Sequence, residues 1–146
     1  MYVSVVFGEL INNLDWFDKF DELRAMYGDD ASVGFAQVKV STAMWLEEGG
    51  YMPRSIDRTS LIKSLVDTVR NIAYSTMYVS LIVRKLSGLD LPIPKIRIIA
   101  SYYAKGIDHA SDSCDVNYVN ELGLVAEQFY FSDDLITLFP RSQNDE

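Results

Sequence analysis

The feature that most constrains this chain is a long apolar stretch at residues 59–86. Its apolar side chains recur at three- and four-residue spacings almost all the way round a helix. A helix that is apolar on so much of its surface has to be buried by neighbouring elements. The sequence therefore predicts one long, buried central helix, which Thr59 or Ser60 would cap at its N-terminus.

Shorter helices are predicted on both sides of this central helix. Helical spacing of apolar residues occurs at residues 2–14, 15–27, 41–48, 95–104 and 117–131. Ser41 or Thr42 can cap the third of these, and strand-forming alternation is weak throughout. Because 146 residues are the length of one domain, we expect a mostly α, single domain over residues 1–132 and a polar C-terminal tail over residues 133–146.

The charge balance excludes several classes of partner. Thirteen Lys and Arg against 21 Asp and Glu give a formal net charge of -8. This argues against binding to nucleic acid or to anionic lipid, since both attract clustered cations. The longest uncharged apolar stretch, residues 71–83, has 13 residues, whereas a membrane helix needs about 20. We expect no membrane insertion, and Glu9 comes too early in the chain for a signal peptide.

The chain has one cysteine and one histidine, which limits metal and nucleophile chemistry. Cys114 cannot form an intramolecular disulfide or a four-cysteine zinc site by itself. His109 cannot supply a histidine-rich metal site. We therefore expect no metal and no cofactor.

Glu9 differs from the other acidic residues in its predicted surroundings. It follows Val5 by four residues and Val6 by three, so on a helix it shares their apolar face. An apolar setting disfavours the carboxylate anion and raises the pKa of the carboxyl group, which suits a proton donor. The alternative is that Glu9 lies at the rim of its helix and faces water.

Three blocks of the sequence occur in the order found in lytic transglycosylases and goose-type lysozymes. Residues 32–38 (SVGFAQV), followed by STA at 41–43, resemble their "S-x-G-L-M-Q-(V/I)-x-P-S-T-A" block. Residues 67–79 (DTVRNIAYSTMYV) resemble their "D-x-x-x-N-I…Y-L" helix. Residues 100–106 (ASYYAKG) are similar to their "A-A-Y-N-A-G" block.

Two further blocks resemble the goose-type group in particular. Residues 27–29 (YGD) match its "W-G-D", which also precedes the glycine and glutamine block. Residues 118–130 (YVNELGLVAEQFY) resemble its last helix, "Y-A-N-D…A-Q-Y-Y". Together with Glu9, the five blocks extend the resemblance over residues 9–130.

The resemblance implies a lysozyme-like fold and a muramidase or lytic transglycosylase activity. The bond cleaved would be the β-1,4 bond between N-acetylmuramic acid and N-acetylglucosamine in peptidoglycan. Glu9 stands in the place of the family's catalytic glutamate, which acts as acid and then as base. Asp29 matches an aspartate that positions water in the goose-type enzymes. The implied substrate-binding residues are Ser32, Gly34, Gln37, Tyr102, Tyr103 and Tyr118.

The implied partner is the glycan strand of peptidoglycan, in the cell wall or the periplasm, and no cofactor is implied. An acidic domain gains no electrostatic attraction to an anionic wall polymer. We therefore expect a larger parent chain or a delivery system to bring the domain to its substrate.

Some positions depart from the family pattern. Glu9 is followed by Leu10 instead of serine, and it precedes Gln37 by 28 residues, more than is usual. Tyr103 replaces the asparagine of the "A-A-Y-N-A-G" block. Glu22 is closer to Gln37 in the sequence and is therefore an alternative candidate for the catalytic glutamate, but it lies on the predicted polar face of the helix at 15–27. Lys39 replaces a second water-positioning aspartate, which favours transglycosylation over hydrolysis.

These departures leave two alternatives open. One is a catalytically inactive, lysozyme-like protein that serves as an interaction, assembly or immunity factor. The other is an unrelated helical domain whose matches to the family are coincidental.

Overall fold

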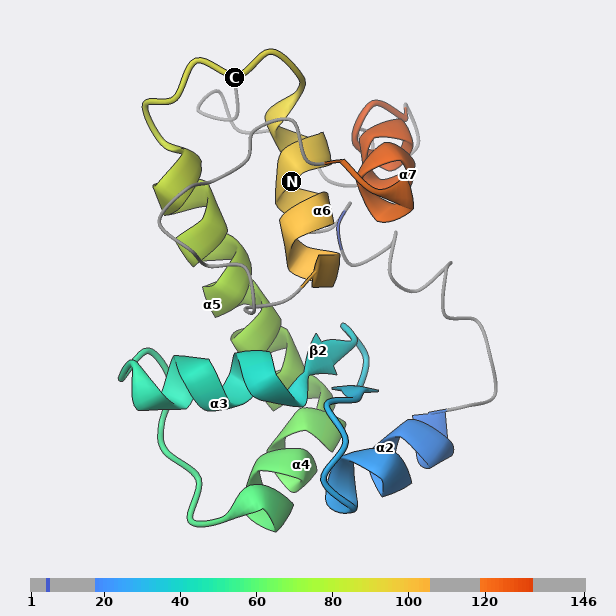
Figure 1. Ribbon diagram of the computed structural model, residues 1–146, viewed down its shortest axis with the longest axis vertical. Coiled ribbons are helices and arrows are strands. Elements are labelled where there is room, and N and C mark those ends of the chain that lie inside the picture. The colour runs from blue at the N-terminus through green and yellow to red at the C-terminus, as the bar shows by residue number, and fades with distance from the viewer. Residues whose placement is uncertain (1–4, 6–17, 106–118, 133–146) are drawn as a thin grey trace.

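The structure is a computed structural model that describes residue 5 and residues 18–105 and 119–132. Figure 1 shows a mostly helical molecule, as predicted. The predicted helix at 2–14, apart from Val5, and the tail at 133–146 lie outside the described residues. The elements are α2 (Asp18–Met26), β1 (Ser32–Val33), β2 (Val38–Lys39), α3 (Val40–Glu48), α4 (Arg58–Val66), α5 (Thr68–Leu86), α6 (Lys95–Lys105) and α7 (Glu121–Tyr130).

Helix α5 is the frame on which the other helices pack. In Figure 1, α3 and α4 lie at its N-terminal end, while α6 runs beside it with α7 on the far side of α6. Helix α2 packs against β1 and α4. Among the described helices, none is both long enough and apolar enough to cross a bilayer.

The single helix predicted at 59–86 is wrong, because the chain forms two helices that meet at Asp67. This residue has an extended backbone (φ -67°, ψ 117°) and is at once the C-cap of α4 and the N-cap of α5. Its carboxylate accepts a hydrogen bond of 2.9 Å from the backbone N–H of Arg70. Aspartate competes well for backbone donors in this way, so it favours a helix start over a helix interior.

The predicted helix caps are also wrong, and aspartates take their place. Asp57 caps α4 and accepts the backbone N–H of Ser60. The N-cap position of α3 is Lys39, whose side chain does not cap. Instead Asp30, from the preceding turn, accepts both the N–H and the hydroxyl of Ser41.

Helix α5 buries one face instead of its whole surface. The side facing the core carries Asn71, Tyr74, Ser75, Tyr78, Val79, Ile82 and Leu86. Val69 is 77% exposed and Val83 is also exposed. The helix is therefore amphipathic, and its buried face includes three polar residue types that need hydrogen-bond partners.

Helix α2 presents a different face to the core from the one expected. Leu23 and Met26 are exposed, whereas Ala25 is fully buried and Asp21 and Glu22 are half-buried. The guanidinium of Arg58 on α4 donates to the carbonyl of Ala25, which holds the end of α2 against α4. The prediction that Leu23 and Met26 belong to the buried face of this helix is therefore wrong.

Helices α6 and α7 pack closely against each other. A side chain at Gly123 would lie within 3.0 Å of the Ser101 hydroxyl and the Arg97 carbonyl oxygen, so only glycine fits. The Ser101 hydroxyl accepts the N–H of Asn120 just before α7. Arg97 also forms an ion pair with Glu127 across the two helices.

We predict that the break at Asp67 is stabilised by its carboxylate cap. Asp67→Ala should lower the free energy of unfolding by about 1 kcal/mol, since it leaves the Arg70 N–H without its acceptor. Asp67→Asn keeps an acceptor oxygen and should cost less than half as much. Urea unfolding followed by circular dichroism measures both, and equal losses would contradict a capping role.

Candidate functional site

The turn between β1 and β2 contains the block that resembles the glycan-binding block of the family. The two strands pair antiparallel, with Ser32 opposite Lys39 and Val33 opposite Val38. The N–H of Gln37 closes the turn on the Gly34 carbonyl at 2.9 Å. The Gln37 side-chain amide also donates to that carbonyl at 3.0 Å, and Gln37 has a left-handed backbone (φ 50°).

A single buried amide, that of Asn71 on α5, holds this turn in place. Its Oδ1 accepts the N–H of Ala36 at 2.7 Å. Its Nδ2 donates to the carbonyls of Val33 and Leu65, each at 2.8 Å. Asn71 is completely buried, so these three bonds satisfy backbone groups that water cannot reach.

Gly34 lets the turn approach Asn71 closely. Its φ of 79° lies in the left-handed region, and an added Cβ would lie within 3.0 Å of the Leu65 carbonyl and the Asn71 amide. Gly34 is therefore needed for packing, whatever its role toward a substrate.

Tyr103 approaches the same turn from α6. Its hydroxyl donates to the Ala36 carbonyl at 2.6 Å, and its ring packs against Tyr78 with centroids 5.7 Å apart. Tyr103 is 5% exposed. Its neighbour Tyr102 is also buried, and the Tyr102 carbonyl accepts the hydroxyl of Tyr78. Both tyrosines belong to the core beneath the turn.

The structure brings some of the predicted site residues together and leaves others apart. Ser32, Gly34, Gln37 and Tyr103 meet at the turn. Asp29 is exposed, and its carboxylate accepts the guanidinium of Arg24 at 3.0 Å. Glu9 and Tyr118 lie outside the described residues.

A second polar centre, which the sequence interpretation missed, surrounds Glu47 on α3. Its carboxylate accepts the N–H and the hydroxyl of Ser55, at 2.8 and 2.7 Å, and the hydroxyl of Tyr74 at 2.5 Å. Glu47 is 9% exposed. Its spacing in the sequence indicates burial, because Glu47 follows the buried residues Val40 and Ala43 by seven and four positions and so lies on their face of the helix.

The Tyr74 hydroxyl is protonated and donates to this carboxylate at neutral pH. Burial of the phenol, together with the adjacent Glu47 carboxylate, raises the pKa of Tyr74 far above its usual value of 10.0. The Tyr74 bond joins α5 to α3, and the two bonds from Ser55 to the same carboxylate hold the loop at 51–57 against both helices.

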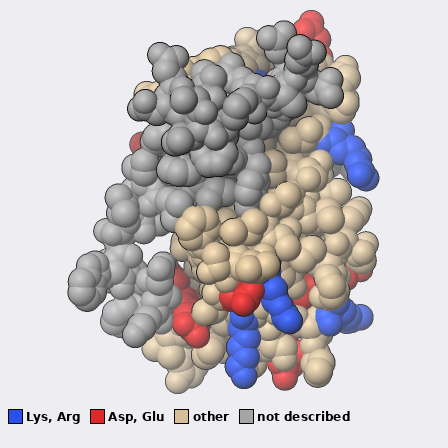
Figure 2. All heavy atoms as spheres, turned by 180° about the vertical axis from the view of Figure 1, so that it is seen from behind, with Lys and Arg blue, Asp and Glu red and all other residues tan. Residues whose placement is uncertain are grey.

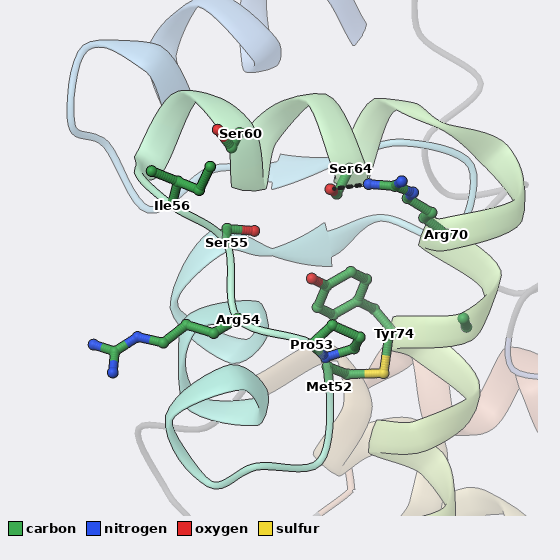
Figure 3. Close-up of a pocket in the computed structure, with 10 residues that line it drawn as sticks. Met52, Pro53, Arg54, Ser55, Ile56, Ser60, Ser64, Arg70 and Tyr74 are labelled. Carbon is green, nitrogen blue, oxygen red and sulfur yellow. Dashed lines mark hydrogen bonds between the residues drawn. The ribbon is translucent and has the colours of Figure 1, made fainter.

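A cavity of about 360 Å³ opens beside this centre, between the loop at 52–56, α4 and α5 (Figure 3). Its lining consists of Met52, Pro53, Arg54, Ser55, Ile56, Ser60, Ser64, Arg70, Ala73 and Tyr74. It lies apart from the β1–β2 turn in sequence and contains none of the predicted substrate-binding residues.

The surface of the described chain is mixed in charge. On the face shown in Figure 2, acidic and basic side chains are interspersed at the end formed by α2, α3 and α4. Arg24 illustrates this, since it pairs with both Asp21 and Asp29. Within the described ranges, no three His, Cys, Asp or Glu side chains gather into a possible metal site.

We predict that Gly34 tolerates no side chain. Gly34→Ala adds a steric clash to the strain of a positive φ and should lower the free energy of unfolding by about 3 kcal/mol or more. Gly50→Ala is the matched control, because Gly50 has φ 73° but open space around its Cβ position. The control should cost about 1 kcal/mol, and equal losses in urea unfolding would contradict the close approach.

We also predict that Tyr74 makes stability fall at alkaline pH. Above about pH 10 the unfolded chain loses the phenolic proton while the folded chain retains it, so the unfolded state is favoured as the pH rises. Tyr74→Phe should cost about 1.5–3 kcal/mol at pH 8 and should reduce this alkaline loss. Urea unfolding at pH 8 and pH 10.5 tests this, with the exposed Tyr51→Phe as control. An unchanged alkaline loss in Tyr74→Phe would contradict it.

Comparison of the chain with protein-family models, with curated proteins and with solved structures finds no match. Any functional conclusion therefore depends on the residues and their geometry.

Proposed function

We propose that this chain is a lysozyme-like domain that cleaves the bond between N-acetylmuramic acid and N-acetylglucosamine in peptidoglycan. The supporting observation is that three separated blocks of the resemblance meet at one residue. Asn71 accepts the N–H of Ala36, and Tyr103 donates to the carbonyl of Ala36. These partners are 35 and 67 residues away along the chain.

The contact among the three blocks supports the proposal because each block is defined by its sequence alone. Coincidental matches would have no reason to lie together and to hydrogen-bond to one another, as these blocks do through Ala36, Asn71 and Tyr103. Here the turn block, the asparagine of the helix block and the second tyrosine of the α6 block form one hydrogen-bonded unit. Such a unit would give a glycan strand a rigid wall, as a preorganised site requires.

The proposed chemistry uses one carboxyl group as acid and then as base. The protonated glutamate donates to the leaving glycosidic oxygen as an oxocarbenium-like state develops. The resulting carboxylate then removes a proton, either from the sugar's own 6-hydroxyl, which gives a 1,6-anhydro product, or from water. Lys39 donates to the Lys105 carbonyl at 3.0 Å, and a lysine there favours the 1,6-anhydro product because it supplies no base for water.

Two glutamates compete for the role of this acid. Glu9 is assigned by the resemblance and by its apolar spacing. Glu22 now competes with it, because it is half-buried on the side of α2 that contains Ala25.

The alternative is a lysozyme-like protein without activity that serves as an interaction, assembly or immunity factor. The buried state of Tyr102 and Tyr103 favours it. The hydroxyl of Tyr103 is bound to Ala36, so this ring contributes packing where an enzyme of the family would use the block to contact sugar.

The proposal is tested by mass spectrometry of the products that the chain releases from purified peptidoglycan. We expect the wild type to release 1,6-anhydro muropeptides, and Glu9→Gln to lower the rate by about 100-fold or more. Glu22→Gln is the matched variant and should retain most of the activity. Circular dichroism establishes that each variant is folded.

Each contrary result has a defined meaning. If Glu22→Gln loses activity and Glu9→Gln does not, Glu22 is the general acid and the proposed function is unchanged. Reducing-end products would make the chain a hydrolase. A folded wild type that releases no product would favour the inactive alternative.

A further inference from the structure

The cavity beside Glu47 has the composition of a small-molecule site. Its volume of about 360 Å³ lies at the small end of the range for such sites. Met52, Pro53, Ile56 and Ala73 give it apolar walls, and hydroxyl groups and a guanidinium give it polar ones. Figure 3 shows these groups arranged around the space between the loop, α4 and α5.

One side of the cavity offers hydrogen-bond donors and a positive charge. Arg70 donates to the Ser64 hydroxyl at 3.0 Å, and Figure 3 shows its guanidinium directed toward α4. Because Ser64 accepts this bond, its own proton remains available as a donor. The remaining N–H groups of Arg70 can bind a carboxylate.

Three other hydroxyl groups of the lining offer acceptors that are backed by negative charge. The hydroxyls of Ser55 and Tyr74 both donate to Glu47. The hydroxyl of Ser60 donates to Asp57. A hydroxyl whose proton is committed to a carboxylate can only accept a further bond, and the carboxylate behind it makes its oxygen a better acceptor.

We propose that this cavity binds a small zwitterion of the amino acid or dipeptide class. The ligand's carboxylate lies on Arg70 and Ser64, its ammonium lies on the oxygens of Ser55, Ser60 and Tyr74, and its side chain lies on the apolar walls. This cavity is separate from the proposed glycan-binding turn, so its ligand binding can be tested independently of glycan cleavage.

The arrangement of opposite charges distinguishes a zwitterion from a simple anion. A phosphate or carboxylate without an amino group would gain from Arg70 but would place negative charge toward Glu47 and Asp57. Arg54 adds little to the cavity's charge, because Figure 3 shows its guanidinium pointing away. A ligand with both charges can bind both the donor and the acceptor groups of the lining.

The test is an NMR titration of the full chain with the dipeptide alanyl-leucine. We expect saturable shifts of the backbone amides of Ser55, Ser64 and Tyr74 at millimolar dipeptide. Alanyl-leucinamide, which lacks the carboxylate, and N-acetyl-alanyl-leucine, which lacks the ammonium, should each bind at least about tenfold more weakly.

Two arginine variants make the test specific for this cavity. Arg70→Gln should weaken alanyl-leucine binding at least about tenfold, whereas the matched Arg84→Gln, on α5 but outside the cavity lining, should leave it unchanged. Both arginines are exposed, so both variants should fold. No saturable shift with the wild type, equal binding of the N-acetyl dipeptide, or equal losses in the two variants would overturn the proposal.

Discussion

The side-chain amide of Asn71 is the interaction on which the arrangement of the described chain depends. It binds β1 through Val33, the turn through Ala36 and the end of α4 through Leu65. An apolar residue of similar size would leave one buried N–H and two buried carbonyls without partners, at a cost of about 1–3 kcal/mol for each group. One amide thus fixes the positions of a strand, a turn and a helix relative to α5.

Helix α5 carries the second polar centre one turn further on. Asn71 is directed to the β1–β2 turn, and Tyr74, three residues later, is directed to Glu47 and the loop at 51–57. The break at Asp67 sets where α5 begins, and therefore how both side chains are placed. The candidate glycan wall and the cavity beside Glu47 are consequently built on the same rigid helix, which keeps each in register with the other.

The sequence predicts where most of the helices form but few of the contacts between them. Helices α3 and α6 form close to where apolar spacing places them. The Asp67 break is hidden because apolar spacing continues through residues 59–86, and only the capping preference of aspartate marks it. Glu47 shares the apolar face of its helix with Val40 and Ala43, just as Glu9 shares one with Val5 in its predicted helix, so the same spacing marks Glu47 as a buried carboxyl group. The partner of Tyr103 could not be predicted, because Ala36 is 67 residues away and nothing local specifies that pairing.

The long sequence separation of the turn's partners has a consequence for folding kinetics. The β1–β2 turn is short, but its amide and phenol partners come from α5 and α6, so its native hydrogen bonds form only after those helices have docked. Contacts between distant residues carry a large loop-closure entropy before they stabilise anything. The turn should therefore be unformed in the folding transition state, and substitutions at Gly34 or Asn71 should mainly accelerate unfolding while leaving the folding rate nearly unchanged.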